Sequence, residues 1–420
     1  MKTDVAVNGG TSSKTNYLTW SPSPAEIWLS DPGTATGPVK VTLRNQRTNV
    51  GGQVIFSTNP SVAGTDELQL DLPPGGGRVA FHVAGKFPHA STADKDAAIE
   101  VVETASGTQL SLTTLMVRIR KDANLLTPGE RDRFISAFAT LNNAGMGRFG
   151  VFRDMHRGIS YYEAHGFAGF LSWHRAYLLD LERELQDVDP SIALPYWRFD
   201  VPAPNLFHRQ FMGESDSVGT VNFAPNNPIQ YWRTDTADGI TRDPLFDPPT
   251  DAAFVISESD TLAYGSTYDA FTAMEGDPHG NAHTSFTGWL QNPANSPKDP
   301  VFFLLHCNVD RLWAKWQHAN DRFDQTDRDV YPYQGKAGTP GATRIGHNRL
   351  DQMWPWNGVT GTSGGVNDRP PTAPGGGLAP SIIVTAPATT PTVGEMIDWQ
   401  GRLSPAARMG FNYDDVPFWP

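Results

Sequence analysis

His279 and His283 stand four residues apart, a spacing that can bring two imidazole nitrogens to one metal ion. In a helix, side chains at positions i and i+4 leave the same face about one turn apart, so the two rings can converge. Such a pair also occurs for packing alone. His306 strengthens the metal interpretation, because it lies between Leu305 and Val309 in a strongly apolar stretch where an unpaired imidazole would be costly to bury.

A second group of three histidines, His156, His165 and His174, precedes the first in the chain. Two triads of imidazoles, with no thiolate and few carboxylates among them, indicate copper, zinc or iron, and an all-nitrogen set on facing helices favours copper. Cys307 is the only cysteine, so the chain cannot form an internal disulfide or a multi-cysteine metal site. Any metal must therefore be held by histidines and carboxylates.

Start signals predict four helices that carry or support these histidines. They begin at Thr127 with a capping box and a proline, at about Ser172, at Asp277 with Pro278, and at Asp299 with Pro300. The second helix is expected to reach about Gln186 and places His174 in its first turn, where the positive end of the helix dipole favours the neutral imidazole that a metal needs. The fourth is expected to reach about Asn320 and contains His306.

Residues 18–117 have the pattern of a β-sandwich of immunoglobulin-like type. Short apolar runs, such as VKVTL at 39–43 and GRVAFHV at 77–83, alternate with Pro, Gly, Asn and Asp turn signals. Residues 359–393 are rich in Gly, Pro and Thr and are expected to form a long surface loop. The fold class is therefore expected to be α+β, with an N-terminal sandwich domain at 18–117 and a mainly α-helical domain at 118–420.

The length and charge of the chain limit the number of domains and the classes of partner that it can have. Its 420 residues exceed the roughly 250 to 300 at which one hydrophobic core stops growing, which favours two domains. The 33 Lys and Arg against 45 Asp and Glu give a net charge of −12 without a basic run, which argues against nucleic acid as a partner. The chain has no apolar stretch as long as the roughly 18 residues of a membrane span, and its start lacks the apolar region of a signal peptide. It is therefore expected not to bind a membrane and to be cytoplasmic, with an exported mature form left open.

Three segments together resemble the copper-binding signatures of the tyrosinase and polyphenol oxidase family, which are type-3 di-copper proteins. The segments are HGFAGFLSWHRAYLLDLERELQ at 165–186, LPYWRFD at 194–200 and DPVFFLLHCNVDRLWAKWQ at 299–317. The resemblance extends from about Arg120 to about Tyr413 and leaves the N-terminal sandwich outside it.

The resemblance implies a central four-helix bundle that holds two copper ions per chain. It assigns the first copper, CuA, to His156, His165 and His174, and the second, CuB, to His279, His283 and His306. It also implies an oxidoreductase of the tyrosinase or catechol oxidase type, with monooxygenase activity included. Such an enzyme binds dioxygen between its metals and oxidises small phenolic substrates to o-quinones, the alternatives being monophenols, o-diphenols and o-aminophenols.

Several residues near the metals acquire expected roles from their positions. Glu275 resembles the family's glutamate that holds a water near CuB, and it is the candidate catalytic base for an incoming phenol. The alternative is that Glu275 is only a helix N-terminal charge near Asp277. Phe302, one turn before His306, is expected to wall the site. Asp310 either orients a ligating imidazole or pairs with an arginine.

Other functions fit the same six histidines. A dioxygen carrier of the hemocyanin kind would keep the ligands and deny phenols access to the metals. A zinc protein would leave three histidines unexplained. The sequence leaves open a homo-oligomer and a copper-delivery chaperone as partners, and it does not decide the natural substrate or the role of the sandwich.

Overall fold

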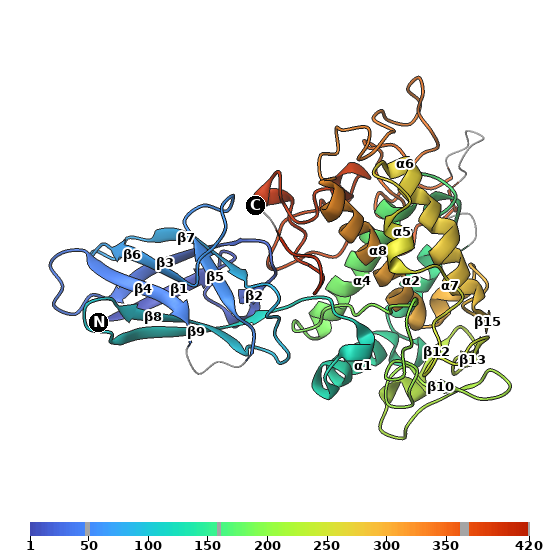
Figure 1. The fold of residues 1–420 in the computed structure, drawn as a ribbon, viewed down its shortest axis with the longest axis horizontal. Helices are drawn as coiled ribbons and strands as arrows, with labels where there is room; N and C mark the ends of the chain where they lie inside the picture. The colour runs from blue at the N-terminus through green and yellow to red at the C-terminus, as the bar shows by residue number, and fades with distance from the viewer. Residues whose placement is uncertain (47–50, 158–160, 362–368, 419–420) are drawn as a thin grey trace. The chain divides into compact units, whose positions relative to one another are not determined.

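The computed structural model describes residues 1–46, 51–157, 161–361 and 369–418 of the chain (Figure 1). The chain forms two compact units. The first comprises Met1–Arg120, Ser381–Ala386 and Trp399–Pro420, and the second comprises Lys121–Pro380 and Pro387–Asp398. Sheets and helices are both present, as an α+β chain of roughly two domains requires. The boundaries 18–117 and 118–420 stay a prediction of the domain organisation.

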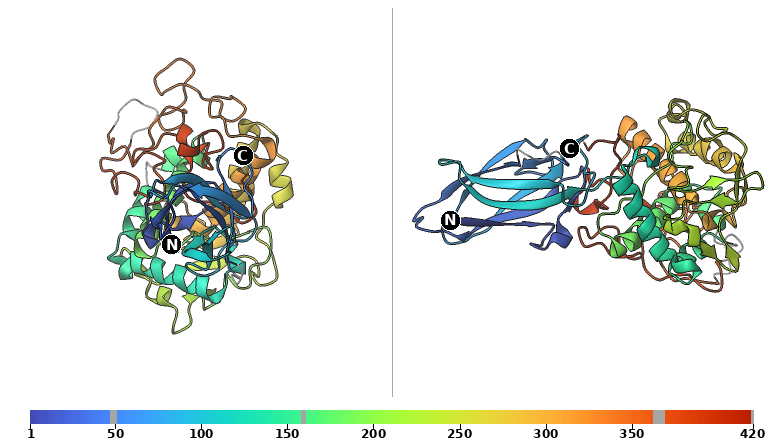
Figure 2. Two further views of the ribbon diagram at one scale, coloured as in Figure 1. Left: turned by 90° about the vertical axis from the view of Figure 1, so that its left-hand side faces the viewer. Right: turned by 90° about the horizontal axis from the view of Figure 1, so that it is seen from below.

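Two β-sheets form the first unit (Figures 1 and 2). One has the strand order β1-β3-β7-β5 and the other β2-β9-β8-β4-β6, and paired neighbours are antiparallel except β2 and β9. The strands are β1 (Lys2–Val7), β2 (Tyr17–Leu18), β3 (Ser23–Asp31), β4 (Val39–Asn45), β5 (Val54–Ser57), β6 (Glu67–Leu72), β7 (Val79–Gly85), β8 (Ala97–Glu103) and β9 (Gln109–Val117). Strand β1 lies before residue 18 and belongs to the sheet because Val5 is paired with Ile27 of β3.

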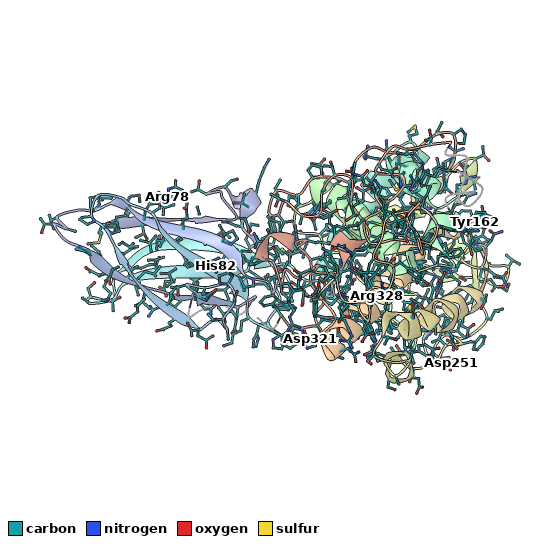
Figure 3. The ribbon with its side chains drawn as sticks, turned by 90° about the horizontal axis from the view of Figure 1, so that it is seen from above. Arg78, His82, Tyr162, Asp251, Asp321 and Arg328 are labelled. Carbon is teal, nitrogen blue, oxygen red and sulfur yellow. The ribbon has the colours of Figure 1, made fainter. Side chains whose placement is uncertain are left out.

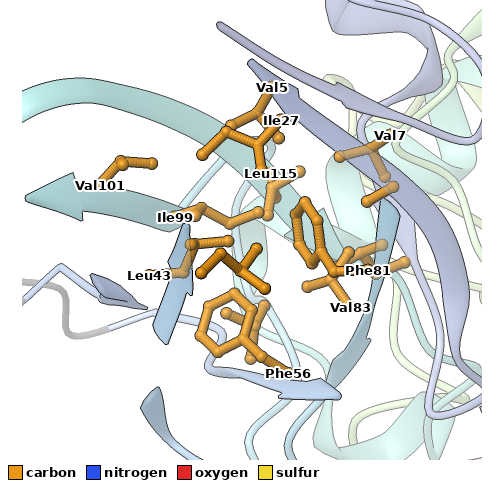
Figure 4. Close-up of a cluster of buried hydrophobic side chains, with 14 of the residues drawn as sticks. Val5, Val7, Ile27, Leu43, Phe56, Phe81, Val83, Ile99, Val101 and Leu115 are labelled. Atoms are coloured by element: carbon orange, nitrogen blue, oxygen red, sulfur yellow. The ribbon is translucent and has the colours of Figure 1, made fainter. Parts of the chain in front are cut away.

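The core of this unit lies between the two sheets (Figure 4). Alternate side chains of each strand face it, because successive side chains in a strand point to opposite faces. In β7, Phe81 and Val83 are buried in this core, and His82 between them is only half-buried on the other face of the sheet. Both sheets contribute, as Ile27 and Phe81 of the first sheet and Leu43 and Ile99 of the second show.

The last segment of the chain is bound to the strands of the same unit. The Trp20 indole Nε1–H donates to the Tyr413 carbonyl oxygen at 2.9 Å, and the Trp20 amide donates to Asn412 Oδ1 at 3.0 Å. The Arg408 guanidinium donates to the Pro22 carbonyl at 2.8 Å. These bonds between distant parts of the sequence explain why residues from Trp399 onward belong to the first unit.

Helices dominate the second unit. They are α1 (Pro128–Asn142), α2 (Phe149–Met155), α3 (Tyr161–Ala164), α4 (Phe170–Val188), α5 (Glu258–Leu262), α6 (Tyr268–Phe271), α7 (Asn281–Thr284) and α8 (Val301–Asn320). Three two-stranded sheets complete it, formed by β10 (Glu214–Ser215), β11 (Val221–Asn222), β12 (Arg233–Thr234), β13 (Ala237–Asp238), β14 (Arg242–Pro244) and β15 (Phe286–Gly288). The predicted capping box of α1 is confirmed, because Thr127 and Glu130 bind each other's backbone amides.

The two longest helices, α4 and α8, lie side by side (Figure 1), and a buried ion pair joins them. Arg175 of α4 donates from Nε to Asp310 Oδ1 of α8 at 2.6 Å, and its guanidinium stacks 3.7 Å from the Trp313 ring centroid. Of the two roles expected for Asp310, the structure shows the pairing with an arginine. The pair joins α4 to α8, the helices that carry His174 and His306.

The segment expected to be a third helix from Asp277 is broken into short turns. A 3₁₀ turn (Thr272–Glu275) is followed by a π-helical turn (Gly276–Gly280) and then by α7. Asp277 has φ −134° and ψ 121°, outside the helical region, because a residue before proline is sterically kept from it. The fourth helix ends at Asn320 as predicted.

Residues 359–393 contain no helix or strand in their described portions, 359–361 and 369–393, as the loop prediction required, and 362–368 lie outside the described residues. In the ranges that the structure describes, α8 and α4 are the longest helices, with 20 and 19 residues, and no helix combines the length and apolarity of a bilayer span.

Candidate metal centre

The first histidine triad is assembled from three consecutive helices. His156 directly follows α2, His165 directly follows α3, and His174 lies within α4. Their potential ligand nitrogens all lie within 4.8 Å of one another, and all three side chains are buried. Helix α4 begins at Phe170, two residues earlier than expected, so His174 lies in its second turn and not in the first.

The second triad comes from the broken segment and from α8. His279 lies in the π-helical turn, His283 in α7 and His306 in α8, with ligand nitrogens again within 4.8 Å of one another. His279 and His283 therefore do not share one regular α-helix, as the sequence led us to expect. The π-helical turn nevertheless keeps their ring centroids 4.8 Å apart.

The two triads are in direct contact. The rings of His174 and His306, one from each triad, are stacked with centroids 4.2 Å apart and planes 12° apart. The rings of His165 and His279 are also stacked, with centroids 6.1 Å apart and planes 27° apart. The six imidazoles thus form one cluster with two adjacent sets of nitrogens, the arrangement that two neighbouring metal ions require.

Backbone carbonyls fix the orientation of five of the six rings. The Nδ1–H groups of His156, His165, His174, His279 and His283 donate to the carbonyl oxygens of Pro293, Tyr161, Phe170, Glu275 and Leu290, at 2.8 to 3.2 Å. Each of these bonds places the proton on Nδ1 and leaves the lone pair on Nε2. The Nε2 atoms are therefore the nitrogens available for a metal.

Three of the inward nitrogens have no hydrogen-bond partner in the part of the chain that the structure describes. The Nε2 atoms of His156, His174 and His279 are buried without a hydrogen bond among the described residues. The Nε2 atoms of His283 and His306 lie 3.2 Å apart. Unpaired buried polar atoms are costly, and bound metal ions would satisfy them.

Burial also holds these rings in the neutral form. It lowers the pKa of His156 to about 3, together with the charge that His283 would carry, and it lowers the pKa of His283 to about 4. The pKa values of His174 and His306 are likewise far below the usual value, first through burial and then through the neighbouring imidazoles. Neutral imidazole is the form that binds a metal, so the donor set fits the pair of ions.

Glu275 lies beside the second triad and is bound from two directions. Its carboxylate Oε1 accepts the Gly166 amide at 2.7 Å, and its carbonyl accepts the His279 Nδ1–H. Burial raises the pKa of Glu275 to about 7, an effect that the Gly166 hydrogen bond partly offsets. A carboxyl group with this pKa can accept and release a proton near neutral pH.

Phenylalanine rings wall the cluster. Phe302 packs against His306 with ring centroids 4.2 Å apart and against His156 at 4.9 Å, so its predicted place one turn before His306 is observed. Phe170, the first residue of α4, packs 4.7 Å from His174 and 4.8 Å from His279. Cys307 is buried and its Sγ lies 3.5 Å from the Leu194 carbonyl oxygen.

His347 supports the site from a distant loop, a role that sequence reasoning missed. Its Nδ1 accepts the buried Gly169 amide at 3.0 Å, directly before Phe170. The fit is tight, because a Cβ on Gly169 would lie 2.6 Å from that nitrogen. Burial lowers the pKa of His347 to about 4, so the ring stays a neutral acceptor. No motif surrounds His347, and only the buried position of its ring reveals the contact.

Comparison with known proteins places the metal centre in a family. Residues 146–319 match the model of the common central domain of tyrosinase. The chain is 30% identical over 268 residues to a tyrosinase of Streptomyces glaucescens, covering 57% of this chain and 92% of that protein. It is 28% identical over 260 residues to the grixazone synthase of Streptomyces griseus, covering 48% of this chain and 85% of that protein.

Solved structures show a weaker likeness. A functional unit of octopus hemocyanin aligns with a TM-score of 0.45 and 19% identity over 72% of this chain and 69% of that one. An aurone synthase, a polyphenol oxidase, aligns with a TM-score of 0.34 and 19% identity over 50% of this chain and 75% of that one. The sequence match to nearly the whole of a bacterial tyrosinase decides the classification: this chain belongs to the tyrosinase family.

Proposed function

We propose that this protein oxidises phenols and o-diphenols to o-quinones with dioxygen, at a pair of copper ions held by its two histidine triads. The family uses a di-copper centre, and the two triads are suited to it. In this proposal, the first copper is bound by His156, His165 and His174 and the second by His279, His283 and His306. The observation that carries the proposal is the cluster of six neutral imidazoles, in which the buried Nε2 atoms of His156, His174 and His279 have no hydrogen bond among the described residues.

The protein's own groups would orient the substrate and move its proton. When bound, the copper ions supply the electrons that reduce dioxygen and the positive charge that attracts a phenol oxygen. Glu275 would take the phenolic proton on a carboxylate oxygen, since its pKa of about 7 lets it be ionised before the transfer and neutral afterwards. The Gly166 amide would hold that carboxylate in place. Phe302 and Phe170 would exclude water from the buried rings.

We also propose finer features of the fold. The two-sheet unit is an immunoglobulin-like β-sandwich, a reading that its shared core between two mainly antiparallel sheets supports. The metal centre is held by a four-helix bundle of α2, α4, α7 and α8, which the buried ion pair between α4 and α8 supports. A homo-oligomer and a copper-delivery chaperone stay predictions.

Metal analysis combined with oxygen uptake tests the function. The purified protein, loaded with copper, should bind two copper ions per chain and consume dioxygen with catechol, tyrosine or 2-aminophenol while the absorbance of a quinone product rises. A protein that binds two coppers and takes up oxygen reversibly, without consuming any of these phenols, would be a carrier. Binding of a single zinc with no copper-dependent activity would also contradict the proposal.

A further inference from the structure

The exposed edge of the histidine site carries two aromatic rings. Tyr162 and Phe167 flank His165 in the chain, and they are 56% and 40% exposed; Tyr162 is labelled in Figure 3. Gly166, between His165 and Phe167, is also exposed, and its amide is the donor to Glu275. Two exposed aromatic side chains therefore lie close in the chain to His165 and to the amide that binds Glu275.

Arg344 places a positive charge at the same edge. Its guanidinium carbon lies 4.4 Å from the centroid of the Phe167 ring. Stacking on an aromatic face leaves the N–H groups at the rim of the guanidinium plane free to bind an anion through two parallel hydrogen bonds. The ring of Phe167 also packs 5.2 Å from His347, so the platform on which Arg344 lies is itself held in place.

The guanidinium of Arg344 has no hydrogen bond or ion pair with the residues that the structure describes. Two buried arginines of this unit are instead bound by carboxylates. Arg242 donates two hydrogen bonds to Asp299, and Arg369 donates two to Glu163. Arg344 thus differs from these structural arginines in keeping its donors available.

The negative charge around the site would repel an anionic substrate, and Arg344 can offset that repulsion. The chain carries a net charge of −12, and the Glu275 carboxylate adds a negative charge next to the place where a phenol must bind. A substrate with an anionic group would be repelled by both unless a cation stood near its path. Arg344 is such a cation, and a bidentate bond to a carboxylate is the contact that its geometry favours.

We propose that Arg344 is a specificity-determining residue that binds the carboxylate of a phenolic acid while the ring of that substrate enters over Phe167. The inference rests on the proposed function, because it concerns the substrate of the same site. Phenols with a carboxylate on a short side chain are then better substrates than neutral phenols of the same size.

A matched pair of catechols tests this inference on the copper-loaded protein. The probes are 3-(3,4-dihydroxyphenyl)propanoate and its methyl ester, which differ in charge and share the reacting ring. In Arg344→Gln, kcat/KM for the acid should fall about five- to tenfold, mainly through KM, while kcat/KM for the ester should change less than about twofold. Arg344→Lys keeps the positive charge without the two parallel N–H groups of the guanidinium. Its kcat/KM for the acid should lie between the values of the unmodified protein and of Arg344→Gln.

Arg328→Gln is the control, since Arg328 is an exposed arginine of the same unit and the change alters the net charge equally (Figure 3). It should leave the acid-to-ester ratio unchanged. Added salt should lower kcat/KM of the unmodified protein for the acid and not for the ester. An unchanged acid-to-ester ratio in Arg344→Gln, or equal losses for both probes, would overturn the role of Arg344. Failure of the unmodified protein to oxidise either catechol would instead overturn the proposed function.

Discussion

Glu275 and Gly166 are joined by a 2.7 Å hydrogen bond between the carboxylate Oε1 and the backbone amide, across a sequence separation of 109 residues. The bond links the turn that precedes His279 to the segment that follows His165. The Glu275 carboxylate is thereby bound next to His165 in the chain, while the Glu275 carbonyl oxygen accepts the Nδ1–H of His279. In the proposed mechanism, the candidate base is thus tied to one segment of each triad.

Glu275→Gln should lower the rate of tyrosine hydroxylation much more than the rate of catechol oxidation. The amide cannot take the phenolic proton, so the rate of tyrosine hydroxylation should fall about 100-fold or more. Catechol is more acidic and needs the base less, so its oxidation should fall less than about tenfold. The measurement is the ratio of the two initial rates in variant and unmodified protein at equal copper content. Equal losses for both substrates would make Glu275 a structural charge.

Replacement of His283 by Ala should remove one copper ion and abolish quinone formation. Three imidazoles per metal leave no spare ligand, and two do not hold the ion at catalytic occupancy. Metal analysis should give about one copper per chain, and catechol oxidation should fall at least about 100-fold. His89→Ala is the control, because His89 is exposed in the other unit and should keep both metals. Two coppers and normal turnover in His283→Ala would disprove the assignment.

His347→Leu should weaken the start of α4. The apolar side chain cannot accept the Gly169 amide, and a buried unpaired N–H costs about 1–3 kcal/mol. His347→Asn offers an oxygen near the position of Nδ1 and should restore most of that loss. Hydrogen exchange of the amides from Gly169 to Trp173 in the metal-free protein checks this, with faster exchange expected in the Leu variant. Exchange that is the same in both variants and the unmodified protein would show that the contact does not hold the helix.

Asp180 should make the second unit less stable as the pH rises from about 4 to about 6. Burial raises its pKa to about 6, although the Ala379 amide and the Trp356 indole each donate to its carboxylate at 2.8 Å. The folded state therefore holds the proton more tightly than the unfolded chain does. The free energy of unfolding is greatest at a pH below the pKa that Asp180 has in the unfolded chain. It declines as the pH rises through the pKa of Asp180 in the folded state, by an amount on the order of 2–3 kcal/mol.

Asp180→Asn tests this pH dependence, because the amide does not titrate. Asn can accept only one of the two donors, so the variant should be less stable by an amount that does not vary with pH. The quantity to compare is the change between pH 4 and pH 6.5 in the denaturant midpoint of the second unit. The decline should be present in the unmodified protein and reduced in the variant, and equal slopes would disprove the role of Asp180.

Local patterns in the sequence were enough to predict several elements. The capping box at Thr127 and Glu130 determines the start of α1, because its two hydrogen bonds join residues three apart. The apolar run after Pro300 predicts α8 and its end at Asn320. Alternating runs predict the strands, since one face of each must be buried. The six histidines were predicted as two triads from their motifs, and the structure brings each triad together.

Contacts across long sequence separations were decided only by the tertiary structure. Carbonyls of Pro293 and Leu290 orient His156 and His283, and neither carbonyl stands in a recognisable motif. Asp310 could bind an imidazole or an arginine by its spacing alone, and the packing of α4 against α8 gave it Arg175.

The roles of His347 and Arg344 depend on a loop that returns to residues 167–169 after more than 170 positions. Propensity and periodicity describe a chain over one or two turns. The partner of a side chain in such a loop is therefore set by the packing of the whole unit, which no local pattern encodes.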